Sequence, residues 1–391
     1  MRTLLHLFIM LPFFLVAQSK TATDAWTYNG TTAEPRTLAQ VLLNKDLLVS
    51  ALFASPELTE KTRSDIFISF PTPDGRLKNF RMFSSPVMPA SLAQKYPDIL
   101  TYTGIGLDNP GERVSVTVSN SGIKAMILGS KGNVFIDPIL ESPGSYRVSY
   151  QEISAPISNH CSGCGIEDAI IVEAPFVNNT NRNEFPECVG EAQPCYTIGD
   201  TLVTYRFAGI LTAEANNEIA DGTVPGGMTW LNALVNQINL LWVRELGFRL
   251  ELVENNDTLI YTDANPTPSE FTAYDMYVEL PLVLDHITEM IGPGGYDTPA
   301  SLLTWEYGAV FNVGYGGGLA YVPGSTSANI PSYDIFNHEI GHNLGSSHNC
   351  STENGWRSTI GGTIMCWRGN TLSGSGGDQY SSHTIDIAIK Y

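Results

Sequence analysis

The chain has 391 residues, of which 43% are hydrophobic and 16% are charged, so it is long enough for two folded domains and too apolar to be disordered throughout. Its 21 basic and 40 acidic residues give a net charge of −19. A surface this acidic repels phosphate backbones, which argues against nucleic acid as a partner. The 36 glycines and 23 prolines favour a loop-rich, partly β structure over a helical bundle.

Residues 1–19 have the features of a secretory signal peptide. Arg2 supplies the positive charge, residues 4–16 are almost entirely apolar, and the small residues Ala17 and Ser19 fit a cleavage site. A membrane anchor needs roughly 17–25 apolar residues, whereas polar sequence begins here at Gln18. We therefore expect an exported, extracellular protein without a transmembrane segment.

Residues 20–195 are predicted to form a β-rich region that ends in a linker. Apolar and polar residues alternate on both sides of the turn sequence at residues 120–122, which predicts a β-hairpin. Residues 70–75 contain two prolines and a glycine and predict a second turn. Residues 155–200 combine prolines, a polar run and four of the six cysteines, a composition typical of a linker between domains.

Residues 196–391 are predicted to form a second, layered domain in which helices and strands alternate. Apolar residues at helical spacing predict a long helix over residues 228–246 and another near residues 278–291. Strands are predicted at residues 201–207, 248–253, 309–313 and 319–322. Strands that alternate with long helices indicate a sheet covered by helices.

Three of the seven histidines lie within eleven positions, and their spacing predicts a catalytic zinc site. On a helix, His338 and His342 are one turn apart and share a face. Gly345 allows the backbone to leave the helix, which would bring His348 to the same metal. Glu339 would then lie beside a metal-activated water. Three protein ligands leave one zinc position open, as catalysis requires, so we expect one catalytic Zn²⁺.

This motif, HExxHxxGxxH, is followed by Met365 within the sequence Gly361-Gly362-Thr363-Ile364-Met365-Cys366. Together they resemble the metzincin zinc metallopeptidases, in particular the secreted bacterial reprolysin-like (adamalysin-type) enzymes. The resemblance implies an α+β fold, in which a β-rich pro-domain precedes a catalytic domain with a twisted mixed sheet, two long helices and zinc in the cleft. One departure is Asn349, which stands where reprolysins commonly have aspartate.

The resemblance also implies roles for residues outside the histidine motif. Met365 would be the Met-turn methionine that lies beneath the three imidazoles. An edge strand of the sheet would pair with an extended substrate; its residues would be Gly317, Gly318, Leu319, Ala320 and Tyr321.

The expected function is that of a secreted zinc metalloendopeptidase, a hydrolase of protein or peptide substrates that is made as a zymogen. Zinc would activate a water, and Glu339 would take its proton as general base and deliver it to the leaving amine. Two alternatives belong to other classes. One is a catalytically silent metzincin-like domain for binding or adhesion, and the other is a zinc amidase that acts on a non-peptide amide. Bound Ca²⁺ is not readable from the sequence.

An even number of cysteines in an exported chain indicates disulfides. Cys350 and Cys366 are isolated in the C-terminal half, and we expect them to pair. Cys161 and Cys164 form a CxxC sequence near the predicted domain junction. We expect a structural disulfide there, with a latency cysteine that blocks the open zinc position as the alternative.

Overall fold

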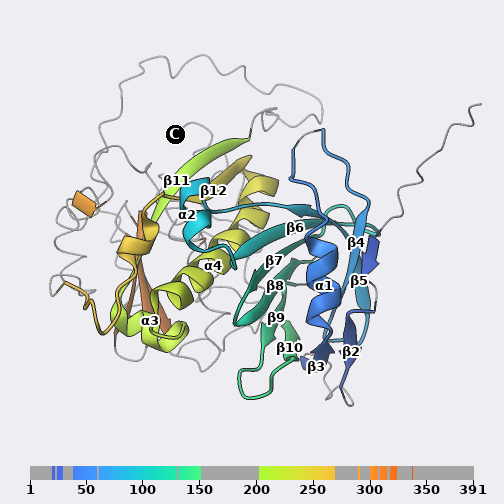
Figure 1. Cartoon of the computed structure of the whole chain (residues 1–391), viewed down its shortest axis with the longest axis horizontal. Helices are drawn as coiled ribbons and strands as arrows, with labels where there is room; N and C mark the ends of the chain where they lie inside the picture. The colour runs from blue at the N-terminus through green and yellow to red at the C-terminus, as the bar shows by residue number, and fades with distance from the viewer. Residues whose placement is uncertain are drawn as a thin grey trace, which may run out of the picture.

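The computed structural model of the chain describes residues 20–22, 24–29, 38–59, 61–129, 132–150, 202–268, 289–290, 300–306, 309–314, 318–323 and 337. They form a mixed α+β structure with two sheets, which agrees with the expected fold class (Figure 1). None of the helices in this described part is long and apolar enough to cross a membrane.

The N-terminal part forms a ten-stranded sheet and two short helices. The strands follow one another in the order β1-β4-β5-β6-β7-β8-β9-β10-β3-β2, and only the β1/β4 pair is parallel. The strands are β1 (Lys20–Ala22), β2 (Trp26–Tyr28), β3 (Leu38–Leu43), β4 (Ile66–Pro71), β5 (Leu77–Ser84), β6 (Leu100–Gly106), β7 (Arg113–Ser119), β8 (Gly122–Leu128), β9 (Val134–Pro138) and β10 (Ser145–Tyr150), and the helices are α1 (Lys45–Leu52) and α2 (Ala90–Lys95).

This sheet curls so that its two ends meet around an apolar core. Trp26 of β2 packs against Phe70 of β4 with ring centroids 6.3 Å apart and against Tyr146 of β10 at 5.4 Å. The hydroxyl of Tyr28 donates to the carbonyl oxygen of Thr72 at 2.8 Å. Helix α1 contributes buried leucines to the same core. The curl buries one face of the strands and leaves the other face for a second layer.

The predicted hairpin is confirmed as the β7/β8 pair. Ser119 pairs with Gly122 and Val118 with Ile123, so the connection is as short as the sequence indicates. Gly122 has a φ of +128°, which a residue with a side chain rarely adopts. The turn predicted at residues 70–75 connects β4 and β5, where Gly75 has a φ of +82°.

The C-terminal part contains a five-stranded mixed sheet and the longest described helix. The strand order is β12-β11-β13-β14-β15; β11 is parallel to β12 and β13, whereas β14 is antiparallel to both of its neighbours. The elements are β11 (Val203–Leu211), α3 (Ala213–Ile219), α4 (Val224–Glu245), β12 (Phe248–Leu252), the 3-10 helix η1 (Asn256–Leu259), β13 (Ala300–Glu306), β14 (Ala309–Gly314) and β15 (Gly318–Pro323).

The long helix predicted from Met228 is α4, and it begins one turn earlier, at Val224. Thr223 is its N-cap, and the Thr223 hydroxyl accepts a hydrogen bond from the amide of Gly226 at 3.0 Å. Pro225 is tolerated because the first turn of a helix needs no amide donors from its own residues. The first turn contains one proline and two glycines, which are poor helix formers, so the sequence pattern does not predict the start of the helix.

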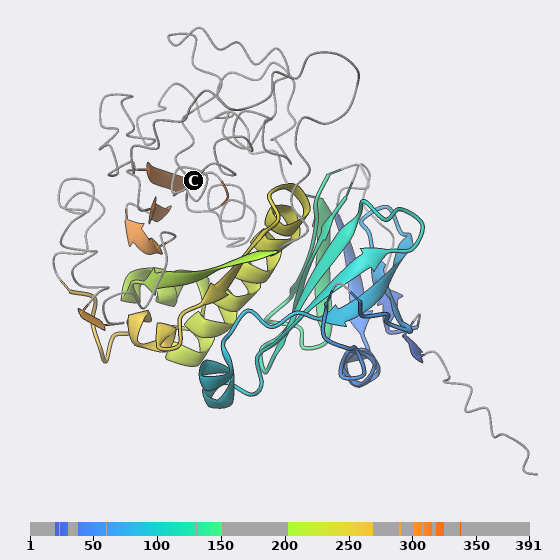
Figure 2. The ribbon, with the colours of Figure 1, turned by 90° about the horizontal axis from the view of Figure 1, so that it is seen from above.

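Helix α4 lies between the two sheets and contacts both. On one side it packs against β6, β7 and β8, and on the other against β12. Figure 2 shows these three layers, with the helix running diagonally between the N-terminal sheet and β11 and β12. The sequence predicts the helix but does not indicate that the N-terminal region covers it.

Two buried asparagines connect helices of the C-terminal part to its strands, each through a pair of hydrogen bonds. The side chain of Asn239 on α4 donates to the carbonyl of Leu250 at 2.9 Å and accepts from its amide at 2.7 Å. Asn256 forms the same kind of pair with Gly209, at 3.0 and 2.9 Å. Each asparagine satisfies both polar groups of a strand residue, so the strands are held in register with the helices.

Other predictions for this part have mixed outcomes. Strands predicted at residues 201–207, 248–253, 309–313 and 319–322 correspond to β11, β12, β14 and β15 with small shifts in their bounds, whereas β13 was not predicted. Of the helix predicted near residues 278–291, only Glu289 and Met290 are described, and both are helical. The signal peptide and the linker predicted at residues 155–200 lie outside the described residues, and the predicted domain boundaries stay a prediction.

Candidate functional site

The predicted zinc site lies outside the part of the chain that the structure describes. This applies to Glu339, Met365 and all seven histidines, and also to the six cysteines of the disulfide and latency predictions. Among the described residues, no three His, Cys, Asp or Glu side chains cluster in a way that could hold a metal ion. The roles of these residues therefore stay predictions.

The residue immediately before the motif, Asn337, is described. It is helical and fully buried. Its side-chain oxygen Oδ1 accepts a hydrogen bond from the indole Nε1 of Trp242 at 3.1 Å, and Trp242 is also 0% exposed. A buried hydrogen bond of this kind contributes about 1 kcal/mol to stability. It connects α4 to the residue whose peptide bond leads directly to His338.

Sequence analysis did not identify Asn337. Neither an asparagine beside a motif nor a tryptophan in a predicted helix indicates a hydrogen-bond partner, and these two residues are 95 positions apart in the chain. Because Cα atoms of consecutive residues are about 3.8 Å apart, a constraint on Asn337 is also a constraint on the start of the predicted zinc-binding helix. Asn337 is thus the described residue that is nearest in sequence to the predicted zinc ligands.

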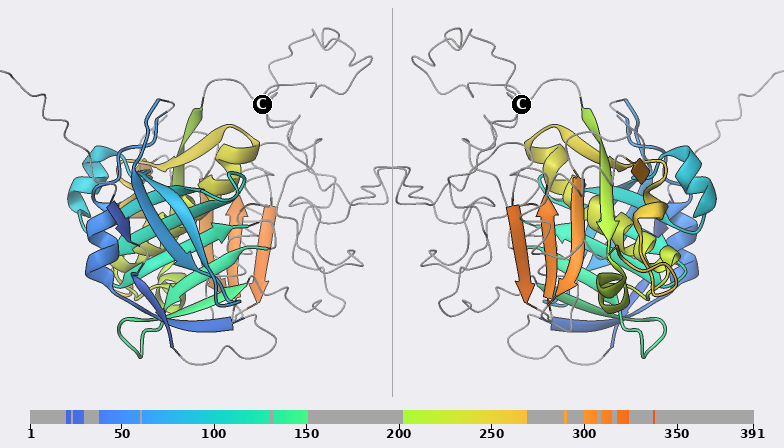
Figure 3. Two further views of the ribbon diagram at one scale, coloured as in Figure 1. Left: turned by 90° about the vertical axis from the view of Figure 1, so that its right-hand side faces the viewer. Right: turned by 90° about the vertical axis from the view of Figure 1, so that its left-hand side faces the viewer.

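The predicted substrate strand corresponds to β15. Gly318, Leu319, Ala320 and Tyr321 belong to it, and Gly317 lies outside the described residues. Leu319 pairs with Val313 of β14 in an antiparallel register. Within the described strands β15 is the last of its sheet, as Figure 3 shows for the three neighbouring strands β13 to β15. Pairing of this strand with a substrate remains a prediction.

Two groups of the described part have strongly shifted pKa values, and both lie far along the chain from the motif. Hydrogen bonding from Arg76 lowers the pKa of Asp74 to about 2. Burial, together with the neighbouring carboxylate of Asp257, raises the pKa of Tyr96 to about 12. Asp74 lies in the β4–β5 turn, whereas Tyr96 follows α2 and faces the C-terminal part.

The C-terminal half carries a three-histidine sequence motif typical of zinc metallopeptidases. Comparison with protein families makes this more specific: residues 203–384 match the model of the metallo-peptidase family M12B, reprolysin-like. The match spans slightly less than half of the 391 residues and includes the whole motif and Met365. The resemblance of this part to reprolysin-like metzincins, drawn above from the motif, is confirmed.

Comparison with individual proteins adds little to this assignment. The crystal structure of metalloproteinase-II from Bacteroides fragilis is similar over 88% of this chain and 94% of its own, with 10% sequence identity and a TM-score of 0.41. A TM-score this low does not establish a common fold. The search of curated proteins found no match.

Proposed function

We propose that the chain is a secreted zinc-dependent metalloendopeptidase that is made as a zymogen. The observation that carries this proposal is the match of residues 203–384 to a reprolysin-like metallopeptidase family, with the complete HExxHxxGxxH sequence inside the matched segment. A binding domain that had lost catalysis would have no need of an intact glutamate beside the histidines. Glu339 and all three histidines are present.

His338, His342 and His348 are the residues that would hold the metal. Three neutral imidazoles are a donor set that zinc prefers, and they leave one position for a water or substrate. When bound there, zinc polarises the scissile carbonyl and acidifies a water. Glu339 accepts the proton of the attacking water and passes it to the nitrogen of the leaving amine as the peptide bond breaks.

Other parts of the chain support binding and orientation. The hydrogen bond between Trp242 and Asn337 would hold the start of the helix that carries His338 and Glu339. Strand β15 would align an extended peptide through backbone hydrogen bonds. Backbone pairing of this kind selects an extended chain and not a particular side chain, which suits an endopeptidase.

Export and latency are proposed from the sequence pattern. Residues 1–19 would direct secretion and be removed. The N-terminal sheet, residues 20–150, would be the pro-region, and activation would follow cleavage in the segment between residue 150 and residue 202. Cys161 or Cys164 is the candidate latency ligand within that segment.

The test compares the purified protein with Glu339→Ala on a denatured protein substrate, with new termini mapped by mass spectrometry. We expect cleavage by the parent and a loss of about 10²–10⁴-fold in the variant, which is the usual contribution of a general base. Zinc content, measured on both proteins, should be equal because Glu339 is not a predicted ligand.

If neither protein cleaves, even after removal of the covalent connection to residues 20–150, the endopeptidase proposal fails. Zinc-dependent hydrolysis of a non-peptide amide would then favour the amidase alternative. Zinc binding without any hydrolysis would favour the binding or adhesion alternative.

A further inference from the structure

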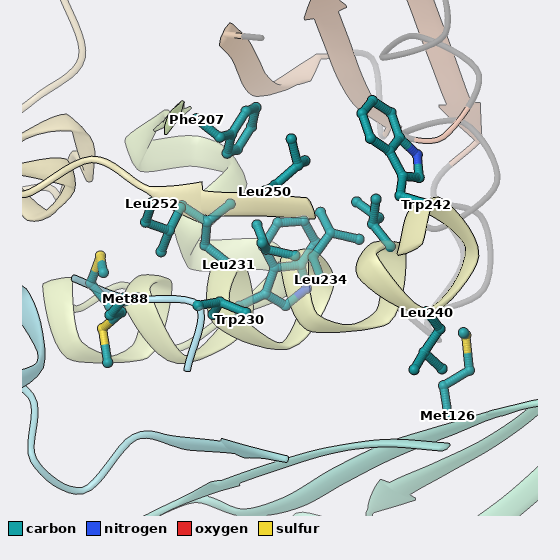
Figure 4. Close-up of a cluster of buried hydrophobic side chains, with 14 of the residues drawn as sticks. Met88, Met126, Phe207, Trp230, Leu231, Leu234, Leu240, Trp242, Leu250 and Leu252 are labelled. Carbon is teal, nitrogen blue, oxygen red and sulfur yellow. The ribbon is translucent and has the colours of Figure 1, made fainter. Parts of the chain in front are cut away.

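One apolar cluster connects the two sheets, and we call it the α4 cluster. In Figure 4, Leu240 of α4 lies beside Met126 of β8, whereas Leu250 and Leu252 of β12 lie on the other side of the helix. The cluster contains seven buried residues from the N-terminal part: Val87, Met88, Leu92, Ile99, Met126, Leu128 and Phe135. The N-terminal and C-terminal parts thus share a core.

The middle of helix α4 is buried on all sides. Every residue from Trp230 to Trp242 is buried, including Asn232, Asn236 and Gln237. A helix on the surface of a domain keeps a polar face toward water, and a helix without one is enclosed by other elements. Removal of the N-terminal sheet would expose the side of α4 that contacts β6, β7 and β8.

The N-terminal sheet is adapted to this contact by small polar residues. On β7, Ser115 and Thr117 alternate with inward valines and would face water in a sheet with one covered side, yet both are buried. The side-chain nitrogen of Asn236 on α4 reaches this face. It donates to the carbonyl oxygens of Val116 at 3.2 Å and Tyr102 at 3.3 Å. A polar helix residue therefore has specific partners in the other part of the chain.

A second contact region lies around α2. The amide of Leu252 on β12 donates to the carbonyl of Val87 at 2.8 Å, so the backbones of the two parts are joined. Lys95 forms an ion pair with Asp257 at 3.0 Å, and the hydroxyl of Tyr96 donates to the same carboxylate at 3.2 Å. The two parts are thus held together at more than one place, by apolar, backbone and charged contacts.

We propose that residues 20–150 remain bound to residues 202–391 after the connection between them is cut. The partner of the α4 face is therefore the chain's own N-terminal sheet, and the processed protein is a two-piece assembly. A pro-region that only covered a cleft would leave behind a complete catalytic core, but here departure would remove one side of the α4 cluster. The proposal holds whichever reaction the protein catalyses.

The test uses the full chain in a Glu339→Ala background, so that self-cleavage cannot occur. The recognition sequence of a site-specific protease is inserted between residues 151 and 201, the protein is cut, and size-exclusion chromatography with light scattering gives the mass. We expect a single peak that contains both pieces in a 1:1 ratio at the mass of the uncut protein. Elution of either piece outside such a peak overturns the proposal. Since the assay measures association, its result is independent of whether the peptidase activity is found.

Two substitutions test whether the described contacts hold the pieces. In the cut protein, separation is measured at increasing urea concentrations. Asn236→Leu should raise the dissociation constant about tenfold at a given urea concentration, because it removes buried hydrogen bonds. Lys95→Met should raise it about two- to fivefold, as expected for an exposed ion pair.

The matched control for these substitutions is Arg76→Met. Arg76 pairs with Asp74 within the N-terminal part, so this variant removes an exposed ion pair that does not bridge the two pieces. It should separate like the parent. If Asn236→Leu and Lys95→Met both behave like Arg76→Met, the described interface does not hold the pieces together and the proposal is overturned.

Discussion

Trp242→Phe tests the connection between α4 and the predicted zinc helix. The substitution keeps an aromatic ring but removes the indole N–H that lies 3.1 Å from Oδ1 of Asn337. Both side chains are fully buried, so the carbonyl oxygen loses this donor where water cannot replace it. The cost of that loss is about 1–3 kcal/mol, and the smaller ring adds the cost of a cavity.

A double-mutant cycle separates the hydrogen bond from the cavity. Trp242→Phe, Asn337→Leu and the double variant are unfolded with urea, and their free energies of unfolding are compared. We expect a coupling of about 1–2 kcal/mol, because each single variant already breaks this hydrogen bond, so that the double variant loses it only once. Trp230→Phe is the control, since Trp230 is also buried on α4 but lies twelve positions, about 18 Å of helix, from Trp242.

The same variants report on activity. If the hydrogen bond positions His338 and Glu339, then kcat of the zinc-loaded, folded Trp242→Phe enzyme should fall about tenfold, which corresponds to about 1.4 kcal/mol. KM should change less, because the substrate strand is not altered. Coupling within about 0.3 kcal/mol of zero, together with an unchanged kcat, would refute the reasoning.

Three further predictions concern pH, packing and metal. Burial, and to a smaller extent the neighbouring carboxylate of Asp257, raises the pKa of Tyr96 from 10.0 to about 12, so the folded protein favours the protonated phenol. The stability that this protonated phenol contributes is complete below pH 10 and is lost as the pH rises to about 12. Urea unfolding at several pH values should show a smaller alkaline loss for Tyr96→Phe, and an unchanged profile would contradict this. Asn239→Leu should lower the free energy of unfolding by about 2–4 kcal/mol, because both of its hydrogen bonds to Leu250 are lost; the exposed Asn217→Leu is the control, and an equally small effect of about 0.5 kcal/mol in both would count against the reasoning. His342→Ala should reduce zinc content below one atom per chain by elemental analysis, and full retention of zinc would remove His342 from the ligand set.

The sequence alone determined the features that depend on local pattern. Alternation around Gly122 predicted the β7/β8 hairpin, and helical spacing of apolar residues after Met228 predicted α4. The histidine motif pointed to the metallopeptidase family that the comparison then supported. These predictions succeed because periodicity and fixed spacing reflect the geometry of a single strand or helix, which neighbouring residues control.

The tertiary structure alone decided which surfaces meet. Ser115 and Thr117 alternate with apolar residues, as residues on a solvent-facing side of a strand do, but α4 covers them and both are buried. This burial is evident only from the structure, in which Asn236 of α4 donates to the carbonyl oxygen of Val116 between them. The bond between Trp242 and Asn337 likewise joins residues 95 positions apart. A local sequence pattern cannot predict such contacts, because a polar residue at a periodic position can equally well face water or bond to a buried partner. The choice between them depends on which element packs on top, and that is a property of the whole chain.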